Sequence, residues 1–383
     1  MEPSRSNMDI YERLGVTRLI NAQTRASKIG GSLMHEEVLR AMAQAAANFV
    51  DMGELLRKAG EHIARLIGVE AVLIVNSAAA GLTVTTAACV AGSDPDKIFR
   101  LPDTRGMKNE VIVHRMQRNH YDCCVRQAGV RLVEIGSSRD THPWELETAI
   151  TDRTAAVVYF ISHIGRFSLP LPEVIRIAHA RDVPVIVDAA SELPPVSNLR
   201  AFLDQGADLV IFSGGKGIGG PQASGLVLGR QEMVARCALN AFPNQNAIGR
   251  SMKVGKEEIA GLVVALERFL QRDFAAERAV WDQRVHTVLD ILKDIPGIHA
   301  SYMADRPEEL ELHPVPVPRA WIELRDAAQQ KMLVTALATG SPAISVRQIG
   351  RTTIAIAPDS LRDGEEVVVA RRIRDVLTGT AGA

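Results

Sequence analysis

Apolar positions follow two different spacings along the first two thirds of the chain. Residues 34–49 and 55–67 carry apolar side chains three and four positions apart, which predicts two amphipathic helices. Short apolar runs then alternate with helical segments, and this alternation predicts repeated βαβ units and a mostly parallel sheet with helices on both faces. The expected strands are 72–75, 111–113, 131–135, 155–161, 183–187, 209–212 and 225–229, and the helices between them include 76–91, 143–150 and 171–180.

The pattern changes after residue 230. Two long helices are expected first, and a smaller α/β domain follows them, with strands near 298–302, 319–324, 343–347 and 353–356 and helices at 327–338 and 363–377. The long helices are expected at 249–270 and 274–292. We therefore expect an N-terminal arm and helix over residues 1–50, a large domain over 51–250, and a connecting helix with a small C-terminal domain over 251–383. Residues 20–32 are too polar for a core and predict a disordered arm or a substrate-side loop.

The segment 207–220, ADLVIFSGGKGIGG, carries the most distinctive chemistry. Its strand leads into Ser213, two glycines and Lys216, and an earlier strand ends in Asp188. Ligands of parallel sheets bind beyond the carboxyl ends of strands, so both side chains are expected at one edge. A lysine there can form a Schiff base with pyridoxal 5'-phosphate (PLP), while the acid keeps the pyridine nitrogen protonated. A glycine-rich turn with a solvated lysine is the alternative.

Two nucleotide-binding motifs fit this segment poorly. Gly215, Gly217 and Gly220 match G-x-G-x-x-G, but a strand-like run follows them where a dinucleotide site needs a helix. A P-loop is excluded because Val210 and Gly217 occupy the positions of its first glycine and its Ser or Thr.

Other strand ends also carry polar or small side chains. Ser77 opens the small-residue run NSAAAG, where backbone N–H groups at a helix start can bind a phosphate, although the same serine is equally an ordinary N-cap. His120 can stack on a flat ring or simply cap a loop. His163 also lies at a strand exit, and Ala190 is small enough to pack against a ring face.

Four basic residues are candidates for binding the acid group of a substrate. Arg250 and Lys253 lie in IGRSMKVGK, which is compatible with a phosphate or substrate contact and with a solvated helix start. Arg347 ends a predicted strand, where its guanidinium can bind a carboxylate with two hydrogen bonds or lie on the surface. Arg25 belongs to the polar arm.

Charge and composition limit the classes of partner. The 44 Lys and Arg residues balance 45 Asp and Glu, which argues against general binding to nucleic acid or to a membrane surface. No apolar run is long enough to cross a bilayer and no signal core is present, so we expect a cytoplasmic protein. The four cysteines contain no C-x-x-C pair and are expected as reduced thiols. No ligand cluster requires a metal.

Taken together, these residues resemble the fold-type I PLP enzymes. Within them, the chain is similar to the branch related to bacterial L-seryl-tRNA(Sec) selenium transferase, and in particular to its short homologues, the D-glucosaminate-6-phosphate ammonia-lyase-like proteins. The resemblance implies a large domain with a mostly parallel central sheet, a smaller C-terminal α/β domain, and a homodimer or higher homo-oligomer with active sites at subunit interfaces. It rests on INAQTRASKIGGSLM (20–34), NSAAAGL (76–82), NHYD (119–122), VDAASELPP (187–195), FSGGKGIGGPQASG (212–225) and GRSMKVGKEEI (249–259).

The resemblance also implies roles for individual residues. Lys216 is implied as the lysine that bonds to PLP, and Asp188 as the partner of its pyridine nitrogen. The implied phosphate contacts are Ser77, Ala78 and Ala79, with Ser213 nearby and His120 near the ring face. The arm sequence and Ser191 depart from the family pattern on the expected substrate side, so the substrate stays open. Without a tRNA-binding domain or a large basic patch, selenium transfer to tRNA is not expected.

We therefore expect a PLP-dependent lyase that acts on a small-molecule amino acid. Lys216 removes the Cα proton, a β-leaving group departs, and ammonia and a 2-oxo acid are released. An aminotransferase, a racemase or an aldolase would use the same activated carbon, and the cofactor motifs do not choose among them. A non-catalytic regulatory protein of the same fold would need neither Lys216 nor Asp188.

Overall fold

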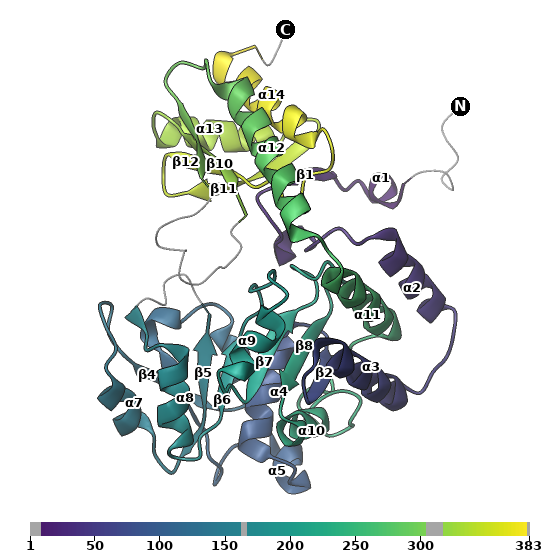
Figure 1. The fold of residues 1–383 in the computed structure, drawn as a ribbon, viewed down its shortest axis with the longest axis vertical. Helices are drawn as coiled ribbons and strands as arrows, with labels where there is room; N and C mark the ends of the chain where they lie inside the picture. Colours follow the sequence, from purple (N-terminus) through teal and green to yellow (C-terminus); the bar gives the residue numbers. More distant parts are fainter. Residues whose placement is uncertain (1–8, 162–166, 304–316, 381–383) are drawn as a thin grey trace. The chain divides into compact units, whose positions relative to one another are not determined.

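The computed structural model describes residues 9–161, 167–303 and 317–380 and contains two compact units (Figure 1). Of the described residues, 26–161 and 167–272 form the larger unit, and 9–25, 273–303 and 317–380 form the smaller one. The junctions therefore fall at 25/26 and 272/273, whereas the sequence pattern placed them at 50/51 and 250/251. The amino-terminal segment is divided between the two units. Its strand at Leu19–Ala22 pairs within the smaller unit, whereas its helix at Glu36–Ala46 packs within the larger one.

The larger unit is built on a seven-stranded sheet with the order β2-β8-β7-β6-β5-β3-β4. Strands β7, β6, β5, β3 and β4 run parallel, while β8 is antiparallel to both of its neighbours. The mostly parallel α/β sheet expected from the sequence is confirmed. The strands are β2 (Ala71–Val75), β3 (Glu110–His114), β4 (Arg131–Ile135), β5 (Thr154–Phe160), β6 (Val185–Asp188), β7 (Leu209–Ser213) and β8 (Gly225–Gly229).

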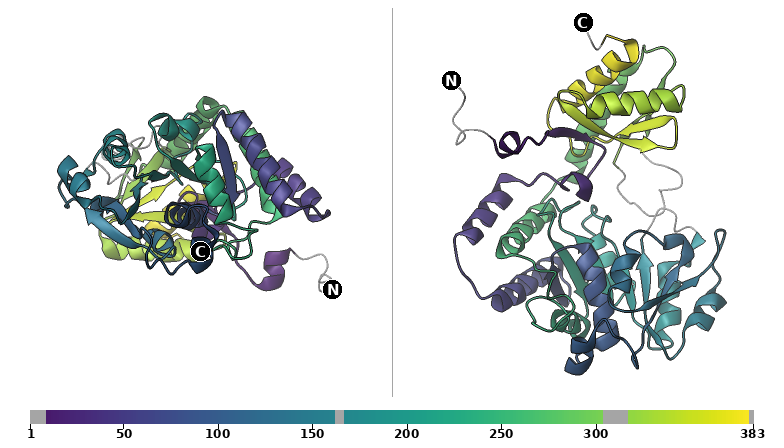
Figure 2. Two further views of the ribbon diagram at one scale, coloured as in Figure 1. Left: turned by 90° about the horizontal axis from the view of Figure 1, so that it is seen from below. Right: turned by 180° about the vertical axis from the view of Figure 1, so that it is seen from behind.

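Helices cover both faces of this sheet. Helix α4 (Ala78–Ala91) packs against β5, β6, β7 and β8 on one face, and α8 and α9 lie on the other (Figures 1 and 2). Nearly every residue of α4 is buried, which explains its apolar, small-residue composition. The remaining helices of these layers are α5 (Pro95–Arg100), α6 (Asp122–Arg126), α7 (Pro143–Ala149), α8 (Leu171–His179), α9 (Asn198–Asp204) and α10 (Gln231–Leu239).

Three helices form a separate layer at the β2 end of the unit: α2 (Glu36–Ala46), α3 (Met52–Ile67) and α11 (Lys256–Leu270). Two expectations were wrong here. Helix α11 begins at Lys256 rather than at residue 249, after Gly255 in an extended conformation. Helix α2 ends before Phe49, whose fully exposed ring does not belong to the apolar face of that helix.

A buried carboxylate joins β6 and β7 at the ends opposite the candidate site. Asp208 is 1% exposed and accepts hydrogen bonds from the Val185 backbone N–H (2.7 Å), from His179 Nε2 (2.9 Å) and from Arg230. Because Val185 begins β6 and Asp208 directly precedes β7, this carboxylate helps to fix the relative position of the two strands that carry the site.

The smaller unit contains a five-stranded sheet with the order β1-β11-β12-β10-β9 and three packed helices. Strand β1 pairs in parallel with β11, and the other pairs are antiparallel. Part of the polar arm is therefore core, contrary to expectation, because Ile20 and Ala22 are buried in this unit. Its elements are α1 (Ile10–Leu14), β1 (Leu19–Ala22), α12 (Phe274–Leu292), β9 (His299–Met303), β10 (Arg319–Glu323), α13 (Ala327–Ala338), β11 (Ala343–Ile349), β12 (Thr353–Ile356) and α14 (Glu365–Thr378).

Candidate active site

The predicted acid and lysine follow neighbouring parallel strands. Strand β6 ends at Asp188 and β7 ends at Ser213, with Lys216 in the turn that follows. A hydrogen bond from Gly219 N to the Lys216 carbonyl (3.0 Å) closes this turn. The topology therefore presents both functional groups at the carboxyl edge of the sheet, where doubly wound folds bind their ligands.

The Lys216 side chain is directed toward the turn that follows β6. Its Nζ donates a hydrogen bond to Ser191 Oγ at 2.8 Å. The two turns are in direct backbone contact, because a Cβ added at Gly217 would lie only 1.9 Å from the Leu193 carbonyl oxygen. A glycine after the lysine is thus required for this close approach.

Two further polar side chains hold the backbone of the lysine turn. Ser32 Oγ lies 2.8 Å from the Lys216 carbonyl and 3.1 Å from the Gly215 carbonyl, so that it can donate to either. Arg272 Nη1 donates to the Gly217 carbonyl at 2.8 Å. The end of the polar arm therefore supports the lysine turn, a role the sequence pattern did not assign to Ser32.

Charged groups at the site influence one another. Asp188 is partly exposed, yet burial of its carboxyl raises the pKa, against the opposing effects of the Ala190 backbone N–H (3.0 Å) and of Lys216. Burial also lowers the pKa of Lys216, against the opposing charges of Asp188 and Glu192. Glu192 is 3% exposed, and burial followed by the charge of Asp188 raises its pKa to about 8. The sequence analysis missed Glu192, although it lies within the quoted VDAASELPP segment.

The start of α4 has the local structure that the predicted anion site requires. Ser77 is its N-cap and accepts a hydrogen bond from Ala80 N at 3.0 Å. Ala78 and Ala79 begin the helix, where backbone N–H groups have no intrahelical acceptor. These amides and the helix dipole favour a phosphate group at this position.

The register of the sheet brings Ser213 toward the start of α4. Gly225 of β8 pairs with Ser213 of β7 on one side and with Val75 of β2 on the other, directly before the α4 start. A Cβ added at Gly225 would lie 2.8–2.9 Å from the Ser77–Ala78 backbone. The strands thus place Ser213 and Ser77 on either side of one glycine.

The histidine candidates are less constrained. His120 lies between the 3₁₀ turn Arg115–Gln117 and α6, after β3, and is exposed. Ala190 follows Asp188 and is partly buried. His163 lies outside the residues that the structure describes.

The basic candidates divide between the two units. In the larger unit, the Arg250 guanidinium lies 5.4 Å from the centre of the Phe242 ring, a cation–π distance, and Lys253 is exposed. In the smaller unit, Arg25 Nε lies 3.5 Å from the buried Asp359 carboxylate.

Arg347 also lies in the smaller unit, on β11 opposite Ala355 of β12. The parallel register of Ala22 with Val346 places Arg25 and Arg347 just beyond the same end of the β1–β11 pair. Binding of a substrate acid group by Arg25 and Arg347 stays a prediction.

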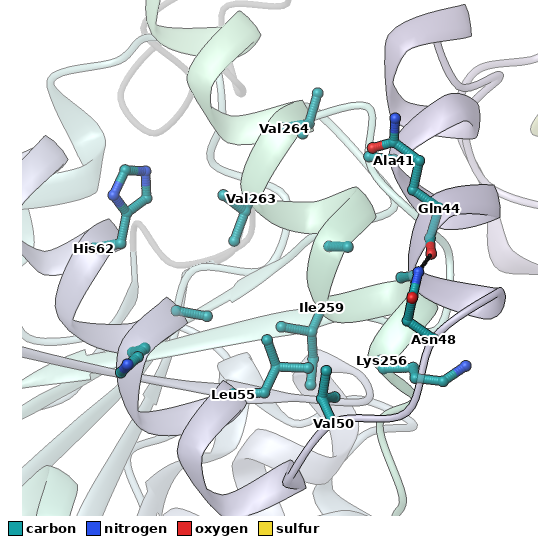
Figure 3. Close-up of a pocket in the computed structure, with 14 residues that line it drawn as sticks. Ala41, Gln44, Asn48, Val50, Leu55, His62, Lys256, Ile259, Val263 and Val264 are labelled. Carbon is teal, nitrogen blue, oxygen red and sulfur yellow. Dashed lines mark hydrogen bonds between the residues drawn. The ribbon is translucent and has the colours of Figure 1, made fainter.

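One cavity of the larger unit contains none of the predicted site residues (Figure 3). It has a volume of about 520 Å³ and lies between α2, α3 and α11. Its lining is mainly aliphatic, with Ile259, Val263 and Leu55 facing it and His62 and Lys256 among the few polar side chains. It lacks the paired acid and base of the strand-end site.

The described part of the chain contains no group of three or more His, Cys, Asp or Glu side chains that could hold a metal ion. Over the same residues, every helix is too short or too polar to cross a membrane.

The strand-end residues fit PLP. Lys216 supplies a primary amine of lowered pKa, suited to bonding with an aldehyde, and Asp188 supplies an enclosed carboxylate that a protonated ring nitrogen would neutralise. The α4 start supplies amides and a hydroxyl for the phosphate.

Sequence comparison gives the family. The family model for SelA, L-seryl-tRNA selenium transferase, matches residues 26–294. This chain belongs to the SelA family. A D-glucosaminate-6-phosphate ammonia lyase from Salmonella typhimurium is 32% identical over 97% of this chain and 99% of its own length. A 5'-C-glycyluridine monooxygenase-decarboxylase from a Streptomyces species is 34% identical over 97% of this chain and 93% of its own.

Structural comparison agrees with the SelA assignment. A solved structure of D-glucosaminate-6-phosphate ammonia-lyase has a TM-score of 0.85 and 30% sequence identity, and it covers 98% of this chain and 100% of its own. Together with more distant structural neighbours, this match shows that the SelA-family chain has the fold-type I architecture of PLP enzymes. The expected family and fold are thereby confirmed.

Proposed function

We propose that this chain is a PLP-dependent ammonia-lyase that acts on an amino acid or amino sugar acid. Its reaction removes the Cα proton and eliminates a β-hydroxyl or another β-leaving group, after which the enamine product hydrolyses to a 2-oxo acid and ammonia. The observation that carries the proposal is the Lys216–Asp188 arrangement at neighbouring strand ends. The full-length sequence and structural similarity to an ammonia-lyase supports this outcome among PLP reactions.

When bound, PLP supplies an electron-withdrawing ring that stabilises negative charge at Cα. Lys216 moves the proton: burial lowers its pKa, so that a larger fraction is the neutral base near neutral pH. Ser191 holds its amino group at 2.8 Å. Asp188 provides negative charge for the ring nitrogen.

Other residues bind the ends of the cofactor and the substrate in this proposal. The phosphate is held by Ser77, by the backbone amides of Ala78 and Ala79, and by Ser213. His120 and Ala190 lie near the ring. Basic side chains hold the acid groups of the substrate, and the candidates are Arg25, Arg250, Lys253 and Arg347.

The names of the two full-length relatives suggest the class of substrate. One acts on D-glucosaminate 6-phosphate and the other on 5'-C-glycyluridine, and both names join an amino acid to a sugar-derived group. We therefore propose a hydroxylated, sugar-derived amino acid. Transfer to tRNA is not proposed, because the chain carries no excess of basic over acidic residues.

The monooxygenase-decarboxylase relative supports a second candidate function. Its full-length identity of 34% is comparable to that of the lyase relative. In this alternative, the activated amino acid reacts with O₂ and loses its carboxylate as CO₂. The two functions share the cofactor site and differ in their products.

A product analysis separates these candidates. Purified protein with PLP is given D- and L-amino acids with β-hydroxyl, β-sulfur and sugar-acid side chains, in air and under argon. Ammonia and 2-oxo acid formed equally with and without O₂ support the lyase, whereas CO₂ release that requires O₂ supports the second candidate. A spectral shift without ammonia or CO₂ would indicate a transaminase or racemase, and an aldehyde product an aldolase.

We further propose a homodimer or larger homo-oligomer in the cytoplasm. The four cysteines are all free thiols, one of them exposed, as is usual in a reducing compartment. Light scattering coupled to gel filtration measures the molar mass in solution, and a mass equal to that of one chain would refute the homo-oligomer.

A further inference from the structure

The lysine of the candidate site lies in a chain segment whose local sequence does little to fix its backbone. Lys216 stands directly between Gly215 and Gly217 in the turn after β7. Because glycine has no Cβ, these neighbours place few steric limits on the two peptide groups beside the lysine. The orientation of these peptide groups therefore depends on contacts with other parts of the chain.

The Ser32 side chain reaches both of these peptide groups. Its Oγ lies 2.8 Å from the Lys216 carbonyl oxygen and 3.1 Å from the Gly215 carbonyl oxygen. Carbonyl oxygens only accept hydrogen bonds, so the hydroxyl proton of Ser32 is directed at this pair. The Lys216 carbonyl also accepts from Gly219 N at 3.0 Å, and its two lone pairs allow both bonds at once.

The arm segment that carries Ser32 is itself attached to the lysine turn. Gln222 Nε2 donates to the Ser27 carbonyl at 2.9 Å. A Cβ added at Gly31 would lie 2.8 Å from the Gly215 carbonyl oxygen, so the two backbones are in direct contact. The position of the serine hydroxyl is therefore set by backbone contacts on both sides, and it does not depend on a long, flexible side chain.

The two peptide groups that Ser32 contacts determine where the lysine side chain points. Because peptide groups are planar, their orientations define φ and ψ of Lys216 and hence the direction of its Cα–Cβ bond. The side chain ends with Nζ 2.8 Å from Ser191 Oγ. Burial lowers the pKa of this amine, against the opposing charges of Asp188 and Glu192. A rotation of either peptide group would move Nζ away from this position.

We propose that Ser32 is a positioning residue for Lys216, because its hydroxyl group holds the two peptide groups that direct the lysine side chain into the site. This inference rests on the proposed function, which assigns the chemistry to Lys216. Ser32 acts through the backbone and touches neither PLP nor the substrate in this role. A displacement of about 1 Å can cost a catalytic group about 10²-fold in rate, so loss of the hydroxyl should slow the steps that use the lysine.

A graded series of substitutions in the cofactor-free protein tests the role without turnover. Ser32→Thr keeps a hydroxyl donor, Ser32→Cys offers a weaker S–H donor, and Ser32→Ala offers none. Lysines are methylated with formaldehyde and cyanoborohydride over a range of pH, and the extent at Lys216 is measured by mass spectrometry after digestion. Since only the neutral amine reacts, the pH of half-maximal labelling follows the pKa of Lys216.

The expected result is an ordered change in this pH. Ser32→Thr should label at the pH of the wild type, while the pH should rise in Ser32→Cys and rise further in Ser32→Ala, because a displaced amine loses part of the burial that lowers its pKa. The series keeps its order even if one variant fails to fold. The same labelling pH in all folded variants would overturn the proposal.

Two controls separate positioning from a general loss of structure. Lys108 is exposed and is measured in the same digests, so its labelling should be equal in every variant. Ser27→Ala removes a hydroxyl from an exposed position of the same arm segment but leaves the carbonyl that Gln222 binds. A rise of the Lys216 labelling pH in Ser27→Ala as large as that in Ser32→Ala would contradict a specific role for Ser32.

The enzyme with PLP provides a second readout. In Ser32→Ala, kcat for ammonia release should fall about 10²-fold while KM changes less than about three-fold, because the lost contact is to the backbone of Lys216 and not to the substrate. Ser32→Thr should recover most of this kcat. A loss confined to KM, or a threonine variant as slow as the alanine variant with unchanged Lys216 labelling, would overturn the positioning role.

These measurements distinguish failure of this inference from failure of the proposed function. An unchanged labelling pH in Ser32→Ala, in a protein that releases ammonia, would refute the role of Ser32 alone. A wild-type protein that releases no ammonia from any β-hydroxy amino acid would refute the lyase function, while the labelling series would still decide whether Ser32 positions Lys216.

Discussion

Replacing Gly217 by alanine tests whether the contact between the two turns positions Lys216, the proposed catalytic lysine. The added Cβ would lie 1.9 Å from the Leu193 carbonyl oxygen and 2.6 Å from its carbonyl carbon. Both are backbone atoms, so no side-chain rotation relieves the overlap. An ordinary contact begins near 3.4 Å, so the two turns must separate by about 1.5 Å.

Two effects of this separation can be estimated. Overpacking of a close-packed region typically costs about 1–3 kcal/mol of folding free energy. A shift of about 1 Å in a catalytic group can reduce the rate about 10²-fold, and the 2.8 Å hydrogen bond between Lys216 and Ser191 spans the two turns that move apart. We therefore expect a folded protein of lower stability with at least about 100-fold lower kcat/KM.

The assay measures ammonia release, PLP affinity from visible absorbance, and urea-induced unfolding. Gly219→Asn is the control in the same turn, because its added Cβ meets open space and asparagine tolerates the positive φ of 76°. A Gly217→Ala protein with wild-type kcat/KM and stability would show that the close contact does not position Lys216.

Three further substitutions test other parts of the account. Asp188→Asn should retain PLP but lower kcat about 10²–10⁴-fold, because the amide cannot neutralise a protonated ring nitrogen; unchanged kcat would contradict this. Ser77→Ala should raise the PLP dissociation constant about ten-fold or more, because a hydrogen bond to a charged phosphate is lost. An absorbance titration measures this constant, and Ser27→Ala, in the exposed 3₁₀ turn, is the control. Asp208→Ala should lower the free energy of unfolding by about 1–3 kcal/mol in urea, because the buried Val185 N–H loses its acceptor; an unchanged midpoint would show that this acceptor is dispensable.

The parallel sheet was predictable because its strands are continuous apolar runs between amphipathic helices. Residues 209–212 and 183–187 read in this way, and their ends carry the lysine and the acid. The α4 start was predictable from small residues after a strand. These features are local in sequence, so that spacing alone reveals them.

The features that the sequence analysis missed depend on contacts between residues far apart in the chain. Ile20 and Ala22 become core only because β1 pairs with β11, more than 300 residues later. Ser32 supports the lysine turn across 184 positions. Glu192 reads as a solvated glutamate until the fold encloses it, although its position four residues after Asp188 is a usable signal.

The most direct test of the central claim is chemical trapping of the cofactor. The protein is incubated with PLP, reduced with sodium borohydride, digested and analysed by mass spectrometry, with Lys216→Ala treated in parallel. The account predicts a visible absorption band that disappears on reduction and a phosphopyridoxyl group on Lys216. A label on another lysine, the same label yield in Lys216→Ala, or no label in a folded wild-type protein would contradict the account.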